Sequence, residues 1–119
     1  MGFLLAAPVV LVGLTAAIEY GAWADRWITA IEVTRSAARE GATRPRSWNP
    51  GPTEMALVVL NGELAEHGLV GVASARLVGD APDQQLEVRV ELVHAPVFGL
   101  FPTPPTAHHA ASFRMQDQP

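Results

Sequence analysis

Cysteine and lysine are both absent from this chain of 119 residues. Without cysteine the chain can form neither a disulfide bond nor a thiolate metal site. All eight basic residues are therefore arginine, and acidic residues outnumber them, which gives a net charge of −4 at neutral pH. This balance argues against a nucleic-acid-binding surface, because such a surface needs an excess of positive charge.

Charge is also absent from the first eighteen residues, MGFLLAAPVVLVGLTAAI, and Glu19 is the first ionisable side chain. At about 1.5 Å of rise per residue, a helix of this length spans about 27 Å, close to the hydrocarbon thickness of a bilayer. We predict a membrane-spanning helix over residues 3–19. Membrane helices tolerate a proline such as Pro8, and Gly13 is small enough for a second helix to approach closely. Glu19 is expected to reach the membrane interface, where Tyr20 also fits.

Two other interpretations of this apolar stretch are open. A secretory signal peptide would carry a basic residue before its apolar run, but none precedes Arg26. A small-residue pair at Ala16 and Ala17 could still serve as a cleavage site, and a soluble protein could bury the helix instead. We favour the uncleaved membrane helix, because the helical pattern continues across the alanine pair.

The helical pattern continues over residues 20–41, where charged and apolar positions are mixed. Trp23, Trp27 and Ile31 recur at helical spacing and predict an apolar stripe. This stripe can pack on the rest of the chain or face other subunits. Gly41 is placed to end the helix. The sequence therefore predicts a long N-terminal helix over residues 1–41, with its second half amphipathic.

Residues 42–119 are expected to form a small head domain. A proline-rich loop leads to a helix that starts near Thr53 and stops before Gly68. An alternation of apolar and polar residues then predicts an antiparallel hairpin of strands at 70–78 and 86–93. Residues 106–116 can supply a third strand. The fold class is α+β, with one helix and a roughly three-stranded antiparallel sheet in the head. Four apolar residues of the middle strand are expected to form its core: Leu86, Val88, Val90 and Leu92.

No catalytic constellation is visible in the sequence. There is no glycine-rich phosphate loop, no nucleophile elbow and no supported pair of carboxylates. The four histidines lack the spacing of a metal site, and neighbouring His108 and His109 on a strand would point to opposite faces. We therefore expect no enzyme activity, no metal and no cofactor.

The layout resembles the TadE-like minor pilins, or pseudopilins, of the tight-adherence (Flp) pilus system. Three stretches carry the resemblance over nearly the whole length. The first is the apolar run with its early Pro8, leading into Ile18-Glu19-Tyr20-Gly21. The second is the small-residue and arginine cluster at 34–42. The third is the proline- and aromatic-rich crossing at 96–105, followed by a final strand that ends Phe113-Arg114-Met115-Gln116.

Membership of this family would imply a single-pass protein of the bacterial inner membrane with its head outside the cytoplasm. Its partners would be the membrane, other pilin-like subunits, the pilus assembly machinery and prepilin peptidase. By its distance from Pro8, Phe3 occupies the place of the family's aromatic residue, while Gly2 stands where the family carries a glutamate. A basic leader upstream of Met1 would be expected for such a protein.

Orientation is the point on which charge and resemblance disagree. Five arginines lie soon after the apolar run, within residues 26–46, and none precedes it, which by the positive-inside rule favours a cytoplasmic head. The resemblance implies the opposite orientation, and a basic leader would reconcile the two. The alternative function is a membrane-anchored or secreted binding module without catalytic activity, with its ligand on the crossing from Phe98 to Phe101.

Overall fold

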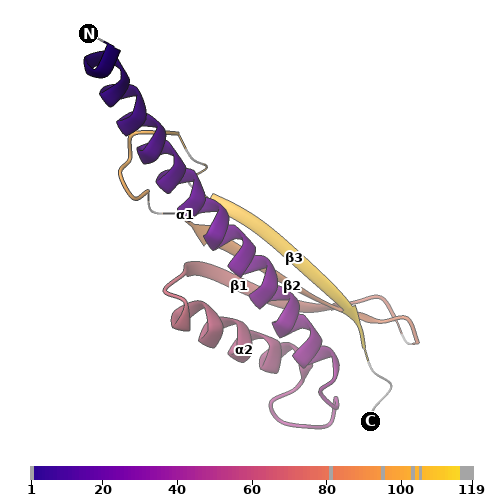
Figure 1. Ribbon diagram of the computed structural model, residues 1–119. Helices are drawn as coiled ribbons and strands as arrows, with labels where there is room; N and C mark the ends of the chain where they lie inside the picture. The colour runs from indigo at the N-terminus through magenta and orange to yellow at the C-terminus, as the bar shows by residue number, and fades with distance from the viewer. Residues whose placement is uncertain (1, 81, 95, 103, 105, 116–119) are drawn as a thin grey trace.

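The first helix of the computed structural model, α1 (Gly2–Ala42), runs almost the length of the molecule and extends well beyond the head (Figure 1). The structure describes residues 2–80, 82–94, 96–102, 104 and 106–115, with side chains described from residue 4 onward. The head contains α2 (Pro52–Glu66), β1 (Val70–Val78), β2 (Gln85–Val93) and β3 (Thr106–Arg114). The molecule is elongated, with extents of 74 × 23 × 17 Å. The predicted α+β fold class is confirmed.

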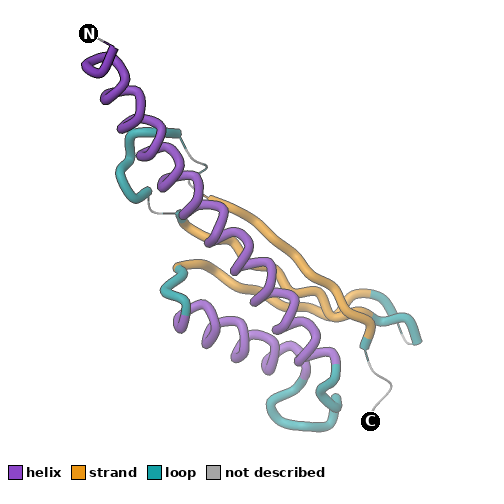
Figure 2. Tube along the Cα trace, in the orientation of Figure 1, coloured by secondary structure: helices purple, strands orange, loops and turns teal. Residues whose placement is uncertain are grey.

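The three strands form one antiparallel sheet in the order β1-β2-β3. Val70 pairs with Val93 across the first ladder, and Gln85 pairs with Arg114 across the second. Both helices lie on the same face of this sheet, as Figure 2 shows: α1 packs against β2 and β3, while α2 packs beside α1 and against β1. This arrangement buries one face of β2, as its alternating pattern requires, and half-buries one face of β1 and of β3.

The core lies between this sheet face and the two helices. The four apolar residues predicted for the middle strand are all buried, which confirms that prediction. They meet Leu60 and Leu64 of α2. The contribution of α1 consists mainly of small side chains, which allow its backbone to lie close to the sheet: Ala30, Val33, Thr34, Ala37, Ala38 and Ala42.

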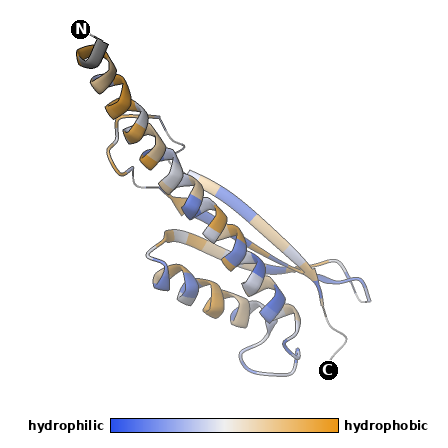
Figure 3. Ribbon diagram, in the orientation of Figure 1, coloured by the Kyte–Doolittle hydropathy of each residue, from blue (hydrophilic) through white to orange (hydrophobic). Residues whose placement is uncertain are grey.

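The N-terminal half of α1 has no such cover. Pro8 lies inside the helix, which continues through it. The large apolar side chains of this half are exposed, and Figure 3 shows the change from the mainly hydrophobic N-terminal half to the mixed second half. By length and composition α1 can cross a membrane. The exposed set comprises Leu4, Leu5, Val9, Val10, Leu11, Val12, Leu14 and Ile18.

Gly41 has a different role from the predicted one. It lies inside α1, which ends at Ala42, so it is not the residue that follows the helix. A Cβ at this position would lie 2.5 Å from Cδ2 of Leu86 and 2.7 Å from the carbonyl oxygen of Pro52. The glycine therefore allows α1 to approach both β2 and the start of α2.

Candidate functional site

The structure brings together residues from the end of the apolar run and from the crossing between β2 and β3. Glu19, which the sequence pattern predicts at the membrane interface, is fully buried within the protein. Its carboxylate accepts hydrogen bonds from the backbone N–H groups of Val97, Phe98 and Gly99, at 2.9, 3.1 and 3.2 Å. Burial of a carboxylate is tolerated only when such partners replace water. We call residues 96–102 the junction loop.

Gly99 gives the junction loop the backbone shape that this contact needs. Its φ angle is 71°, in the left-handed region that side chains disfavour. The three successive N–H groups at 97–99 converge on one carboxylate, an arrangement used elsewhere to bind anions. Here the anion is a side chain of the same protein, and it ties the junction loop to α1.

Tyr20 makes a second link between α1 and the junction loop. Its hydroxyl donates a hydrogen bond of 3.1 Å to the carbonyl oxygen of Pro102. Its ring lies 6.1 Å from the ring of Phe101, between centroids, at an interplanar angle of 49°. Glu19 thus holds the first half of the junction loop through the loop's own backbone N–H groups. The next residue, Tyr20, holds the second half through the carbonyl oxygen of Pro102 and the ring of Phe101.

Two turns further along α1, Arg26 meets His94 at the base of the same crossing. The Arg26 guanidinium donates to Nδ1 of His94 at 2.9 Å. Arginine cannot accept a hydrogen bond, so Nδ1 of His94 must carry no proton and act as the acceptor. Burial, then the positive charge of Arg26, lowers the pKa of His94 below its ordinary value of 6.5, while the Glu19 carboxylate acts in the opposite direction. Nε2 of His94 is buried and has no hydrogen-bond partner among the described residues.

The predicted stripe of Trp23, Trp27 and Ile31 lies at the border of the interface between helix and head. All three side chains are half-buried. The two tryptophan rings stack with centroids 6.3 Å apart and planes 2° apart, and the Trp27 ring meets His109 of β3 edge-on at 6.0 Å. The fully buried stripe of α1 consists instead of the small residues around Ala30 and Ala37, because only small side chains fit where the helix lies closest to the sheet.

The other candidate residues of the apolar half lie away from this junction. Pro8 and Gly13 are exposed, and a Cβ at Gly13 would meet nothing within 4 Å. Phe3 lies in the helical backbone, and its side chain is outside the described part of the chain. The structure therefore joins Glu19 and Tyr20 to the head and leaves Pro8 and Gly13 available for other contacts.

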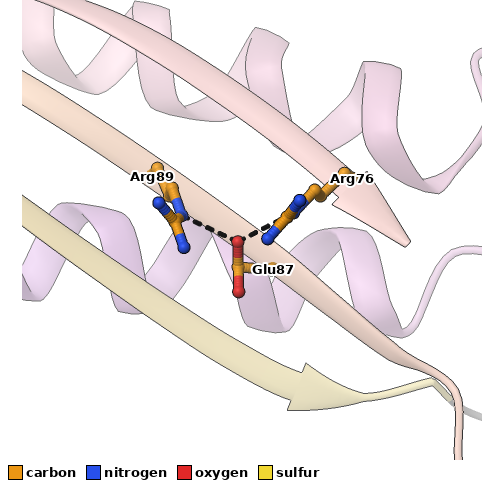
Figure 4. Close-up of polar contacts among 3 residues, drawn as sticks. All are labelled: Arg76, Glu87 and Arg89. Carbon is orange, nitrogen blue, oxygen red and sulfur yellow. Dashed lines mark hydrogen bonds and ion pairs between the residues drawn. The ribbon is translucent and has the colours of Figure 1, made fainter. Parts of the chain in front are cut away.

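The outer face of the sheet carries a separate group of charges. Glu87 of β2 accepts hydrogen bonds from Arg76 at 3.0 Å and from Arg89 at 2.7 Å (Figure 4). The hydrogen bond from Arg89, then that from Arg76, lowers the pKa of Glu87 below its ordinary value of 4.5. An open hollow of about 500 Å³ lies on this face beside Val72, Ser74 and His108. The pairs of Glu87 with Arg76 and Arg89 lie at the surface and contribute little to stability.

The histidines do not come together. His67 lies near Glu63 on α2 at 3.8 Å, and His108 lies on the outer sheet face near Glu91 at 4.0 Å. His109 is half-buried while its neighbour His108 is exposed, so the prediction of opposite faces is confirmed. Among the residues that the structure describes, no three metal-ligating side chains form a cluster.

Sequence reasoning identified the two partners of the junction separately and did not pair them. The sequence marks Glu19 as the end of the apolar run and residues 96–105 as a proline- and aromatic-rich crossing. The available signal was the lack of charge from Pro96 to Pro102, together with a glycine between two prolines. An apolar turn of this kind needs an acceptor for its N–H groups, and Glu19 is that acceptor.

Comparison with known proteins adds no relative: no family model, no curated protein and no solved structure matches this chain significantly.

Proposed function

We propose that this protein is a pilin-like subunit, a minor pilin or pilus-assembly protein of a tight-adherence type pilus. It acts by membrane anchoring and by helix packing with other subunits rather than by catalysis. The observation that carries the proposal is the division of α1 into an exposed apolar half and a half packed on an α+β head. A helix of this kind can lie in a bilayer before assembly and against other helices afterwards.

Two further features support the proposal. The exposed half of α1 includes Gly13, whose surroundings are empty in the single chain, so another helix can approach there closely. The packed half uses alanines to hold the head against the helix along several turns. The head would therefore move with the helix as one unit, which a subunit assembled through its helix needs.

The proposed location is the bacterial inner membrane, with the head outside the cytoplasm. Because the chain contains no cysteine, a single Ser112→Cys substitution on the exposed outer face of β3 supplies a unique label site. In intact cells that produce this variant from its own locus, we expect the protein in the membrane fraction and the cysteine reactive toward a membrane-impermeant maleimide. Labelling only after permeabilisation would place the head in the cytoplasm and contradict the proposal.

The pilus role requires a second readout in the same strain. Deletion of the gene should reduce the pili recovered by shearing, and the Ser112→Cys variant should restore them. The amino-terminal sequence of the membrane-bound protein should show removal of an upstream leader. A soluble species that begins near Glu19, with unchanged piliation in the deletion strain, would favour the secreted binding module instead.

A further inference from the structure

The junction loop exposes apolar side chains although it lies against the helix. Val97 and Phe98 are 47% and 48% exposed, and Leu100 is 72% exposed. The segment from Pro96 to Pro102 contains no charged residue. An exposed apolar group of this kind on a small head marks a contact surface.

The position of the junction loop indicates what that surface contacts. His94, at the base of the crossing, meets Arg26, whereas the loop itself meets Glu19, seven residues nearer the N-terminus. At about 1.5 Å per residue, the loop therefore extends about 10 Å beyond the base of the crossing along α1, toward the apolar half. Figure 1 shows this loop beyond the sheet, alongside α1. Its apolar side chains thus lie at the level where the predicted membrane span ends.

Part of the backbone of the junction loop has its polar groups bonded within the protein, which suits surroundings with little water. Pro96 and Pro102 have no N–H group, and the N–H groups of residues 97–99 donate to the Glu19 carboxylate. The carbonyl oxygen of Pro102 accepts the Tyr20 hydroxyl. Backbone that enters the border of a bilayer must have its polar groups satisfied within the protein, and these three N–H groups and this carbonyl oxygen meet that demand.

We propose that the junction loop inserts its apolar side chains into the lipid interface beside α1. The occupant of this surface is the bilayer itself, because the surface is continuous with the exposed apolar half of the helix. The protein then meets the membrane at two points, the span and the loop. This inference rests on membrane insertion of α1, which the proposed function also requires.

Three single-cysteine variants of the full chain test the inference in phosphatidylcholine liposomes. Leu100→Cys reports on the junction loop, and Val72→Cys on the outer face of the sheet is its control, because the two native side chains are 72% and 73% exposed. Leu11→Cys reports on the middle of the span. Each cysteine carries a polarity-sensitive fluorophore, and the liposomes contain lipids with a spin label near the headgroup or deep in the acyl chain.

We expect the Leu100 label to shift its emission to the blue and to be quenched most strongly by the shallow spin label. The Leu11 label should be quenched most strongly by the deep one, and the Val72 label by neither. A Leu100 label that behaves like the Val72 label while Leu11 is quenched would overturn the loop inference and leave the membrane span intact. Loss of quenching at Leu11 as well would overturn both.

A second copy of the chain is the competing occupant, and dilution distinguishes it from lipid. The blue shift at Leu100 should be unchanged when the number of proteins per liposome is lowered to one or fewer. A shift that disappears on dilution would mean that the loop contacts another subunit, and it would overturn the lipid assignment.

Discussion

At the scale of single residues, the important feature is Glu19, at the end of the apolar run. This acid has three N–H partners and no exposed surface. Glu19 does not need solvent, because Val97, Phe98 and Gly99 donate to it. Its removal would leave three donors without an acceptor, and such a loss costs more than the hydrogen bonds themselves contribute. Glu19 therefore holds the first half of the junction loop, while Tyr20 contacts its second half at Phe101 and Pro102.

We expect Glu19→Ala to release the junction loop and Glu19→Gln to loosen it, because glutamine keeps one acceptor oxygen. Amide hydrogen exchange at residues 97–99 should become much faster in the alanine variant and moderately faster in the glutamine variant. The amides of β2 at Val88 and Val90 serve as the internal control and should stay protected. Unchanged exchange at 97–99 in Glu19→Ala would show that other contacts hold the loop.

His94 makes the stability of the head dependent on pH. Its pKa in the folded protein is lowered below 6.5, first by burial and then by Arg26, so the unfolded chain binds a proton that the folded chain excludes. The folded state therefore has its full stability, as far as His94 is concerned, above pH 6.5. This stability is lost as the pH falls through and below this value. Burial, followed by the charge of Arg35, lowers the pKa of His109 as well, which adds a change of the same sign.

The measurement is the thermal unfolding temperature of the protein in detergent between pH 5 and pH 8, followed by circular dichroism. We expect the unfolding temperature of the wild type to fall as the pH drops below 6.5. The fall should be smaller in His94→Gln and smallest in a variant that also carries His109→Gln. Equal slopes in the three proteins would show that neither histidine is responsible.

At the scale of secondary-structure elements, the close approach of α1 to α2 and β2 depends on a glycine. A methyl group at Gly41 would lie 2.9 Å from the Cβ of Ala56, in addition to its short distances to Leu86 and Pro52. Overpacking of this kind typically costs about 1–3 kcal/mol. Backbone atoms are among the neighbours, so a change of side-chain rotamer cannot relieve the clash.

We therefore expect Gly41→Ala to lower the free energy of unfolding by about 1–3 kcal/mol. Gly62→Ala is the matched control, because Gly62 also lies in a helix but a Cβ there meets nothing within 4 Å. It should raise the stability by about 0.5–1 kcal/mol through its better helix propensity. Chemical denaturation in detergent, followed by far-UV circular dichroism, measures both. A stabilising Gly41→Ala would contradict the packing described for this site.

At the scale of the whole molecule, the two halves of α1 have different surroundings. The head covers the second half and leaves the side chains of residues 4–14 exposed. Only at the end of the apolar run, at Glu19, does the junction loop contact the first half. A soluble helix with so many exposed apolar side chains would associate with other surfaces. A bilayer supplies the apolar surroundings that suit this half.

Leu11→Arg tests this division. An arginine near the middle of a span costs about 3 kcal/mol of insertion free energy, so less of the protein should be in the membrane fraction and more should aggregate. Val72→Arg, at a similarly exposed apolar site on the head, should leave the distribution unchanged. Cell fractionation followed by carbonate extraction gives the measurement. Equal behaviour of the two variants would show that residues 4–18 do not enter a bilayer.

Local patterns in the sequence determined the elements and the character of their faces. The uncharged run predicted the apolar half of α1, and the alternation from Leu86 to Leu92 predicted both the middle strand and its buried face. These features follow from the repeat of a helix or a strand, which a short stretch of sequence already contains. The three strands and two helices were therefore predictable within a few residues.

Only the tertiary structure decided which distant residues meet. Glu19 and the loop at 97–99 are separated by about eighty residues, and no local repeat connects them. The same holds for Gly41, which reads as a helix end in the sequence but faces Leu86 and Pro52 in the fold. The distance between α1 and the sheet also decides that small residues, and not Trp23 and Trp27, lie where the helix comes closest to the sheet. Such distances are set by the packing of all the elements together, and this packing placed the carboxylate of Glu19 beneath the junction loop.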